Sequence, residues 1–253
     1  EVASGNAQGY HAADYYWKGK HPGWGYFTAV PFGLTYQEMN AWIRHGGGQE
    51  LWDELAGEFG LKSIMCGSTG TQAGGWFNKE INSADDLKGL KMRIPGLGGQ
   101  VISKLGGTTV TLPGSQIYEN LVSGAIDATE WVGPWNDLSL AFYQAAKFYY
   151  WPGFHEPGAG LATGINLDTW NSFSNSEQSI IRQILAFENH YTLAAFNHHN
   201  AIALDTLINK HNVQMRTFSS EIMKSLKKLS DEVLEDVSTR SEISKKIFLS
   251  FKD

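Results

Sequence analysis

The sequence predicts an α/β fold assembled largely from βαβ units. Short apolar strands alternate with helical segments, and glycines separate most of them, a pattern typical of a mostly parallel sheet. A helical pattern without interruption then runs from 175 to about 211, and an amphipathic, charged segment follows it. The chain has 253 residues, 42% hydrophobic and 18% charged, so it can bury the core of one large or two medium domains.

The first helices are predicted from their end signals. Thr35 and Glu38 form a capping box before one helix, and glycines follow its last turn. A one-turn helix begins after Ser83 and ends at Gly89. Other helices are expected at about 49–59, 98–105, 113–122 and from about 134 onward, and strands at 61–67, 91–94, 108–112, 125–132 and 147–151.

The helix predicted from 175 is unusually long. Ser174 and Glu177 form its capping box, and Ile180, Ile184 and Phe187 keep helical spacing. At about 1.5 Å per residue the helix would span roughly 50 Å, more than the width of one small domain. We therefore expect it to lie along two domains or to project into a partner.

Composition excludes several classes of protein. The net charge of −6 gives no basic surface for nucleic acid, so we expect no nucleic-acid partner. Cys66 is the single cysteine, which excludes a disulfide within the chain, and we expect it to be a buried, inert thiol. We find no run of 18 apolar residues and no signal peptide at the start, and the abrupt opening suggests a truncated or processed amino terminus.

Polar side chains follow several predicted strands, at the edge where open α/β sheets bind ligands. Gln72 lies in a glycine-rich turn, Arg93 at a strand end, Glu130 and Trp131 at another, and Glu156 in "FHEPG". Taken singly, each has an ordinary explanation: an arginine on a strand, for example, is most often a solvated or salt-bridged surface group.

The histidines show no metal-binding spacing. There is no HExxH or similar motif, so surface or helix-packing roles are favoured for His11, His21, His155, His198 and His199. We also find no GxSxG elbow, no P-loop and no full GxGxxG fingerprint.

Three long segments carry a resemblance to a known family. "GGWFNKEINSADDLKGLKMRIPGLGGQV", "LPGSQIYENLVSGAIDATEWVGPWND" and "YYWPGFHEPG" resemble the periplasmic solute-binding proteins of TRAP transporters. The chain is most similar to the DctP-type, TakP-like branch that binds 2-oxo acids, and the resemblance extends from "AADYYWKGK" to the carboxy-terminal helices. Family members have a further strand and helix before the segment that opens this chain.

The resemblance implies a fold similar to type II periplasmic binding proteins. Two lobes would flank a cleft, joined by hinge strands and crossed by the long helix. We assign 1–65 and 131–160 to lobe I, which would lack its first strand and helix. Lobe II would comprise 66–130 and 161–253 with the long carboxy-terminal helices.

The resemblance also implies a ligand site. Arg93 would form a bidentate ion pair with a ligand carboxylate, and Gln72 would donate a hydrogen bond to the ligand. The aromatic segment of Tyr15, Tyr16 and Trp17 would wall the cleft from lobe I. The planar guanidinium suits a carboxylate because its parallel donors match the two oxygens and its charge does not titrate away.

A metal ion is implied next to that carboxylate. Glu130, the main-chain carbonyl of Trp131 and Glu156 match the positions that hold a cation in the 2-oxo-acid binders. Hard oxygen ligands suit Na⁺ or Ca²⁺ better than zinc. Two glutamates, a ligand carboxylate and Arg93 sum to −2, so we favour Ca²⁺.

The sequence thus predicts an extracytoplasmic receptor, not an enzyme. It would capture a pyruvate- or lactate-like 2-oxo or 2-hydroxy monocarboxylate in the periplasm and deliver it to TRAP permease subunits. The oligomeric state stays open, and a homodimer through the long helix is one arrangement that the sequence allows. Two alternatives stay open. A metal-assisted enzyme would use Glu130 or Glu156 as base, and a sugar-binding module would stack tryptophans on its ligand but leave Arg93 unpaired.

Overall fold

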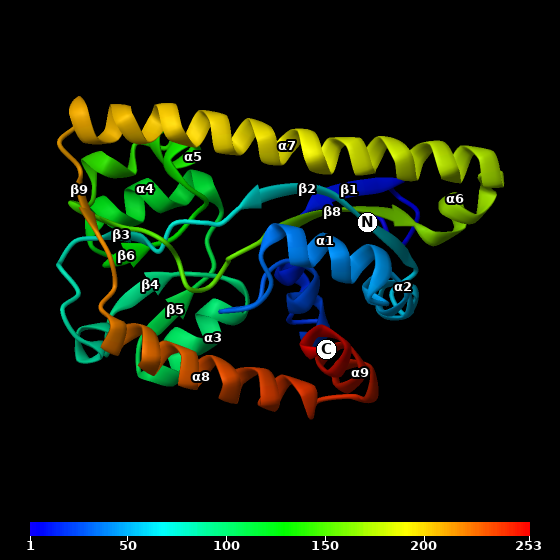
Figure 1. Cartoon of the computed structure of the whole chain (residues 1–253), viewed down its shortest axis with the longest axis horizontal. Coiled ribbons are helices and arrows are strands. Elements are labelled where there is room, and N and C mark those ends of the chain that lie inside the picture. Colours follow the sequence, from blue (N-terminus) through cyan, green and yellow to red (C-terminus); the bar gives the residue numbers. More distant parts are fainter.

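The computed structural model describes residues 1–253 and contains two β-sheets with helices packed around them (Figure 1). The smaller sheet has three strands in the order β1-β8-β2, and the larger has six in the order β5-β4-β6-β3-β7-β9. The strands are β1 Gly9–Ala12, β2 Leu61–Gly70, β3 Gly75–Phe77, β4 Lys91–Arg93, β5 Thr108–Val110, β6 Ala128–Thr129, β7 Phe148–Tyr150, β8 Ala159–Asn166 and β9 Gln214–Arg216.

The two sheets differ in strand direction. In the larger sheet β4 runs parallel to β5 and β6, and β7 runs parallel to β9, whereas β3 is antiparallel to both of its neighbours. The smaller sheet is entirely antiparallel. The predicted α/β class is confirmed, but the expectation of mostly parallel pairing is wrong for the smaller sheet. β2 and β8 are separated in the chain by most of the larger sheet, so no βαβ crossover sets their direction.

Nine α-helices and four 3₁₀ helices surround the sheets. The predicted capping boxes of Thr35 with Glu38 and of Ser174 with Glu177 are both present. No helix combines the length and apolar character that crossing a membrane requires. The α-helices are α1 Tyr36–His45, α2 Gly48–Gly57, α3 Gly96–Leu105, α4 Gly114–Ser123, α5 Pro134–Ser139, α6 Leu167–Ser172, α7 Asn175–Asn209, α8 Ser220–Ser238 and α9 Glu242–Lys252, and the 3₁₀ helices are η1 Asp14–Trp17, η2 Pro22–Phe27, η3 Ala84–Leu87 and η4 Phe142–Gln144.

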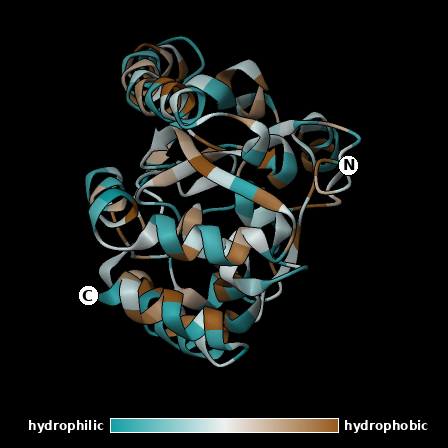
Figure 2. Cartoon of the chain, turned by 90° about the vertical axis from the view of Figure 1, so that its right-hand side faces the viewer, coloured by the Kyte–Doolittle hydropathy of each residue, from teal (hydrophilic) through white to brown (hydrophobic).

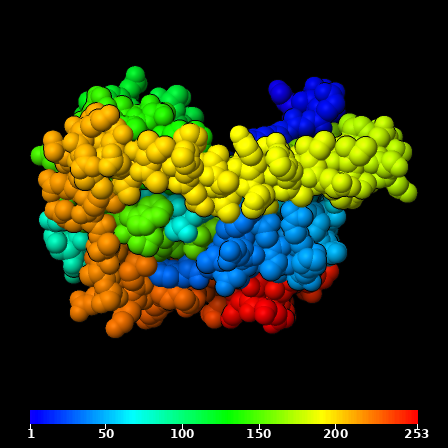
Figure 3. Space-filling model, turned by 45° about the horizontal axis from the view of Figure 1, so that its top comes forward, coloured from blue at the N-terminus to red at the C-terminus, as the bar shows by residue number.

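Helix α7 confirms the predicted long helix. It has 35 residues and runs along the whole length of the molecule, past β2 at one end and α5 at the other (Figure 1). The space-filling view shows it as a continuous ridge over the rest of the chain (Figure 3). One rigid element therefore touches both sheets.

Two extended segments also connect the sheets, and they lie side by side. Residues 71–74 lead from β2 to β3, and residues 151–158 lead from β7 to β8. The amide of Gln72 donates to the carbonyl of Glu156 at 3.0 Å, and the amide of Gly153 donates to the carbonyl of Gln72 at 2.9 Å. We call this pair the crossing segments.

The strand pairing groups the chain differently from the predicted lobe boundaries at three strands. Residues 66–70 of β2 fall in the range assigned to lobe II, yet β2 pairs with β8 in the smaller sheet along its whole length. β7 lies in the range 131–160 assigned to lobe I, yet it pairs with β3 and β9 in the larger sheet. Most of β8 falls in the range assigned to lobe II, yet it pairs with β1 and β2 in the smaller sheet. Backbone pairing places the change of lobe in the crossing segment 151–158, because β7 and β8 flank it.

The core is rich in stacked aromatic rings. Phe27 lies between Trp52 and Trp42, with ring centroids 4.9 and 5.5 Å apart and nearly parallel planes. Under the larger sheet Trp76 stacks on Tyr149 at 4.2 Å. Figure 2 shows hydrophobic and hydrophilic stretches alternating along the helices that face the viewer, so each helix has an apolar side. Most of the chain's large aromatic content is therefore core.

Candidate functional site

The crossing segments place two predicted polar residues at one cavity. Gln72 is 4% exposed, and its Nε2 donates to Thr69 Oγ1 at 3.0 Å. Glu156 is 2% exposed on the neighbouring segment. Gln72 Oε1 and Glu156 Oε2 are buried without a hydrogen-bond partner. Both side chains line the cavity, so two unsatisfied oxygens belong to one site.

Arg93 is buried at the end of β4 and is not a surface group. It is 1% exposed, and its Nη1 donates to the carbonyl of Glu130 at 3.1 Å and also to the Glu130 carboxylate. Its Nε donates to the carbonyl of Leu112 at 3.2 Å. The guanidinium carbon lies 4.7 Å from the ring centre of Trp131, a cation–π contact. Parallel pairing of β4 with β6 sets Arg93 opposite Thr129, the residue before Glu130.

Glu130, His155 and Glu156 form a compact buried cluster. Each offers a ligand atom, and these atoms lie within 4.8 Å of one another. His155 Nε2 is 3.1 Å from Glu130 Oε2, while the other ring nitrogen has no partner. Glu130 and Glu156 are distant along the chain, but the fold brings their carboxylates close together, so both can reach one ion.

The electrostatics of the cluster favour binding of positive charge. Burial raises the pKa of Glu156, and the nearby charge of Glu130 raises it further. Burial alone would lower the pKa of His155, but the hydrogen bond and charge of Glu130 outweigh it, and the pKa is raised. Glu156 therefore holds a proton more readily than an ordinary carboxyl group, and two buried carboxylates beside one arginine favour a cation.

His155 corrects a prediction, because surface or helix-packing roles were favoured for the histidines. It is 1% exposed and hydrogen-bonded to Glu130. In a regular strand, neighbouring side chains point to opposite faces, so strand periodicity would place His155 and Glu156 on opposite sides. Residues 151–158 are not in a strand, and this irregular backbone lets both side chains face one point. The adjacency of histidine and glutamate in "FHEPG" was the available signal.

The aromatic wall contains two of its three predicted residues. Tyr15 and Tyr16 line the cavity, and the Tyr16 hydroxyl is 3.4 Å from Arg93 Nη2. Trp17 packs edge-on against Tyr10 and lines a different, apolar hollow. In the 3₁₀ helix η1, consecutive side chains point about 120° apart, so three in a row cannot share one wall. The wall from this segment is therefore limited to the two tyrosines.

The cavity between the two sheets is small. Its volume is about 210 Å³, and its walls come from both sheets and from α7. Trp131 and Asn136 lie on the side of the larger sheet, and Ala159 and Leu161 belong to β8. Phe196 of α7 completes the wall. A ligand of a few heavy atoms would touch both lobes.

The residues at the cavity fit a hard cation. The two carboxylates and the unpartnered amide oxygen of Gln72 supply oxygen ligands, and His155 supplies one nitrogen. Cys66 is not among the residues that line the cavity or form the cluster. Oxygen-rich sets of this kind suit Ca²⁺ or Na⁺. The four predicted groups Gln72, Glu130, Trp131 and Glu156 are thus gathered in one place, next to Arg93.

Two sheets joined by paired crossing segments, with a small cavity between them that is lined by Gln72 and Glu156, define a two-lobed solute-binding protein. The chain belongs to the bacterial extracellular solute-binding protein family 7, DctP, whose model matches residues 1–240. The resemblance to TRAP solute-binding proteins is confirmed. A monocarboxylate 2-oxoacid-binding periplasmic protein of Nostoc sp. is 41% identical over 251 residues, covering 99% of this chain and 69% of that protein.

Three solved TRAP solute-binding proteins have the same fold. One from Colwellia psychrerythraea, with bound calcium and pyruvate, has a TM-score of 0.96 and 40% identity over 100% of this chain and 77% of that chain. One from Pseudoalteromonas atlantica, with sodium and pyruvate, has a TM-score of 0.95 and 39% identity over 99% and 76%. A Bordetella bronchiseptica dimer with calcium and picolinate has a TM-score of 0.96 and 34% identity over 99% and 74%.

A buried aspartate anchors the segment that carries the tyrosine wall. Asp14 is fully buried and accepts hydrogen bonds from Tyr10 Oη at 2.9 Å and Trp52 Nε1 at 3.0 Å. Burial raises its pKa to about 6, although these hydrogen bonds act in the opposite direction. Sequence reasoning missed Asp14, because its partners Tyr10 and Trp52 are brought to it by the fold and no local motif marks the residue.

Asp14 makes a testable contribution to pH-dependent stability. Its folded pKa lies above the unfolded value, so the stability it contributes is present below about pH 4 and is lost as pH rises through about 6. A shift of about two units corresponds to roughly 2–3 kcal/mol. In Asp14→Asn, the free energy of unfolding should therefore fall less between pH 4 and 7 than in the wild type, measured by denaturant titration. Identical pH profiles would contradict the assignment.

Proposed function

We propose that this protein is a TRAP receptor that captures a small 2-oxo or 2-hydroxy monocarboxylate together with a metal ion. The observation that carries the proposal is the buried guanidinium of Arg93, adjacent to a cluster whose three ligand atoms lie within 4.8 Å. Pyruvate, which is bound in two related structures, has the size and charge that this site accepts. Other short 2-oxo acids and lactate share those features.

Arg93 is the proposed carboxylate partner. Its Nη1 and Nε are committed to Glu130 and Leu112, whereas Nη2 has only the long contact with the Tyr16 hydroxyl. We expect the ligand carboxylate to meet the guanidinium at its Nη2 edge. Gln72, Tyr15 and Tyr16 would then complete the walls around the ligand.

Glu130, Glu156 and the carbonyl of Trp131 are the proposed cation ligands. The unpartnered Glu156 Oε2 supports this, because a buried carboxylate oxygen without a hydrogen-bond donor is costly. The cation would neutralise the glutamates and attract the ligand's carboxylate and 2-oxygen. We favour Ca²⁺ over Na⁺, since a divalent ion balances the summed charge of −2, and we expect Na⁺ to bind more weakly.

We infer a receptor rather than an enzyme and place it in the periplasm. Family membership supports both inferences, as does the description of the Nostoc relative as periplasmic. Ligand contacts from both lobes would favour a closed form, because closure brings the two walls together. The closed form would then be recognised by TRAP permease subunits. Conversion of pyruvate on incubation with the protein would instead support a metal-assisted enzyme.

We further propose that two copies associate through α7. Ile180, Ile184, Phe187 and Tyr191 are 55–63% exposed and spaced four, three and four residues apart, so they form one apolar stripe. Such heptad spacing favours helix–helix pairing. The Bordetella relative is described as a dimer, which supports a second copy of this chain as the occupant.

Replacing Arg93 should remove ligand affinity. Arg93→Lys keeps the charge but lacks the planar guanidinium that bonds Glu130 and Leu112 while presenting Nη2 to the ligand, so calorimetric affinity for pyruvate should fall about 10- to 100-fold. Arg93→Ala should leave no measurable binding. Arg240→Lys, a matched change at an exposed arginine, should bind like the wild type. Circular dichroism should verify folding of each variant, and wild-type affinity in folded Arg93→Lys would remove Arg93 from the site.

Metal removal should weaken pyruvate binding. Protein stripped with a chelator and kept in sodium-free buffer should bind pyruvate poorly, because the uncompensated glutamates repel the carboxylate. Added Ca²⁺ should restore affinity, and Na⁺ should restore less of it, as followed by calorimetry. Glu156→Gln should blunt the response to Ca²⁺. Affinity unaffected by stripping would overturn the proposed role of the cation.

Disrupting the α7 stripe should dissociate the dimer. Phe187→Asp buries a charge in the proposed interface, so light scattering should report the monomer mass of 28.0 kDa instead of twice that value. Val122→Asp changes a residue 61% exposed on α4 and serves as the control. A monomeric wild type at micromolar concentration would count against the proposal.

A further inference from the structure

Asp137 is a buried carboxylate to which the proposed ligand site gives no role. It lies in α5, is 0% exposed and is not among the residues that line the cavity between the sheets. Its Oδ2 accepts hydrogen bonds from Trp76 Nε1 and from Tyr149 Oη, each at 2.9 Å. These donors come from β3 and β7 of the larger sheet. They tie the carboxylate into the core but use only one of its two oxygens.

The second oxygen of Asp137 holds the backbone between β6 and α5. Asp137 Oδ1 accepts from the amide of Val132 at 3.4 Å. On the other side of this residue, the carbonyl of Val132 accepts from the amide of Ala73, in a crossing segment, at 3.0 Å. Val132 is therefore fixed from both sides, and the peptide group that joins it to Trp131 has a defined direction.

The direction of this peptide group decides where the Trp131 carbonyl points. The bond between Trp131 and Val132 is trans, so its carbonyl and its amide hydrogen point in opposite directions. Because the amide points to Asp137 in the core, the carbonyl points away from it. This carbonyl accepts no hydrogen bond within the chain, whereas the carbonyls of Glu130 and Val132 both do. Its lone pairs are thus free, and both residues of the peptide group line the cavity between the sheets.

We propose that Asp137 is a positioning residue that directs the Trp131 carbonyl towards the cation of the proposed site. This role rests on the proposed function, in which that carbonyl is a cation ligand. A carbonyl oxygen binds a hard cation through its lone pairs, so a fixed direction favours the ion. Partners that orient a metal ligand from behind are typical of metal sites, and their loss usually weakens metal binding by about 10- to 100-fold. Asp137 would act through the peptide group without touching the ion.

Asp137→Asn removes the orienting contact and keeps the contacts with the core. The new side chain has a single oxygen, and the two short hydrogen bonds from Trp76 and Tyr149 should retain it. Its NH₂ group then faces the amide of Val132, so two donors oppose each other and the peptide group has to turn. Tyr149→Phe is the matched control, because it removes a hydrogen bond from the same carboxylate but leaves the one from Val132.

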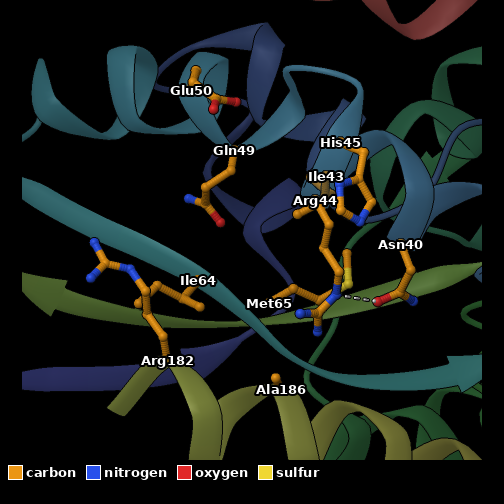
Figure 4. Close-up of a pocket in the computed structure, with 10 residues that line it drawn as sticks. All are labelled: Asn40, Ile43, Arg44, His45, Gln49, Glu50, Ile64, Met65, Arg182 and Ala186. Atoms are coloured by element: carbon orange, nitrogen blue, oxygen red, sulfur yellow. Dashed lines mark hydrogen bonds between the residues drawn. The ribbon is translucent and has the colours of Figure 1, made fainter. Parts of the chain in front are cut away.

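A second control separates geometry from net charge. Glu50→Gln makes the same change from acid to amide in a separate hollow, which is formed by α1, α2, β2 and α7 (Figure 4). None of the residues that line this hollow belongs to the cavity between the sheets. Its effect on Ca²⁺ affinity therefore reports what the loss of one distant negative charge does by itself.

Calorimetric titration with Ca²⁺ in the presence of pyruvate compares these proteins. Asp137→Asn should bind Ca²⁺ at least about 10-fold more weakly than the wild type, and both controls should bind it like the wild type. Tb³⁺ in place of Ca²⁺ gives a direct readout, because its luminescence lifetimes in H₂O and D₂O count the water molecules bound to the ion. Asp137→Asn should admit an additional water where the carbonyl has turned away. A loss of charge or of core stability would leave this count unchanged.

The outcomes distinguish the role of Asp137 from the proposed function. An unchanged water count in folded Asp137→Asn would overturn that role, whatever happens to Ca²⁺ affinity, and the proposed receptor would stand. An equal loss of Ca²⁺ affinity in Tyr149→Phe would also overturn it, because Asp137 would then act only through the core. A wild type without cation-dependent pyruvate binding would overturn both proposals.

NMR of the wild type tests the same contact if Asp137→Asn does not fold. The Val132 amide should be protected from hydrogen exchange before Ca²⁺ is added, because Asp137 already holds it. Addition of Ca²⁺ with pyruvate should then shift the signal of the Trp131 carbonyl carbon. Rapid exchange of that amide, or a carbonyl signal that does not move, would contradict the proposed positioning.

Discussion

The site depends on a fully desolvated guanidinium. Arg93 is 1% exposed, and a buried charge of this kind is tolerated only with counter-charge and satisfied donors. Glu130 supplies both through its carbonyl and its carboxylate. His155 occupies the second oxygen of Glu130, and Glu156 lies beside them. The buried charge of Arg93 is thus balanced by a cluster of three neighbours, Glu130, His155 and Glu156.

The two glutamates that balance the charge of Arg93 come from different parts of the fold. Their positions therefore depend on how the two lobes are arranged. Glu130 follows β6 of the larger sheet, whereas Glu156 lies on a crossing segment that leads into the smaller sheet. Tyr15 and Tyr16 belong to η1, which the buried Asp14 ties to Tyr10 and Trp52. A rotation of one lobe against the other would therefore change the distances between the two tyrosines and the two glutamates. In the proposed receptor, ligand affinity and lobe position would be coupled through these residues.

The sequence indicated the parts of the structure that depend on local signals. Capping residues located α1 and α7, and strand ends located Gln72, Arg93 and Glu130. Features that depend on long-range pairing could not be derived in this way. The antiparallel smaller sheet and the lobe to which β7 belongs follow from contacts between distant segments. His155 and Trp17 were misplaced because irregular or 3₁₀ backbone departs from the side-chain periodicities on which sequence reasoning relies.

Charge, more than volume, explains why a monocarboxylate suits this cavity. Arg93, Glu130 and Glu156 together carry one negative charge when both glutamates are ionised, so an anion arriving alone would enter a repulsive site. A cation alone would leave an excess of positive charge if it were divalent. A divalent cation with one monocarboxylate brings the sum to zero, whereas a dicarboxylate would leave it at −1 in a site shielded from water. Uncompensated charge is costly there because the dielectric is low.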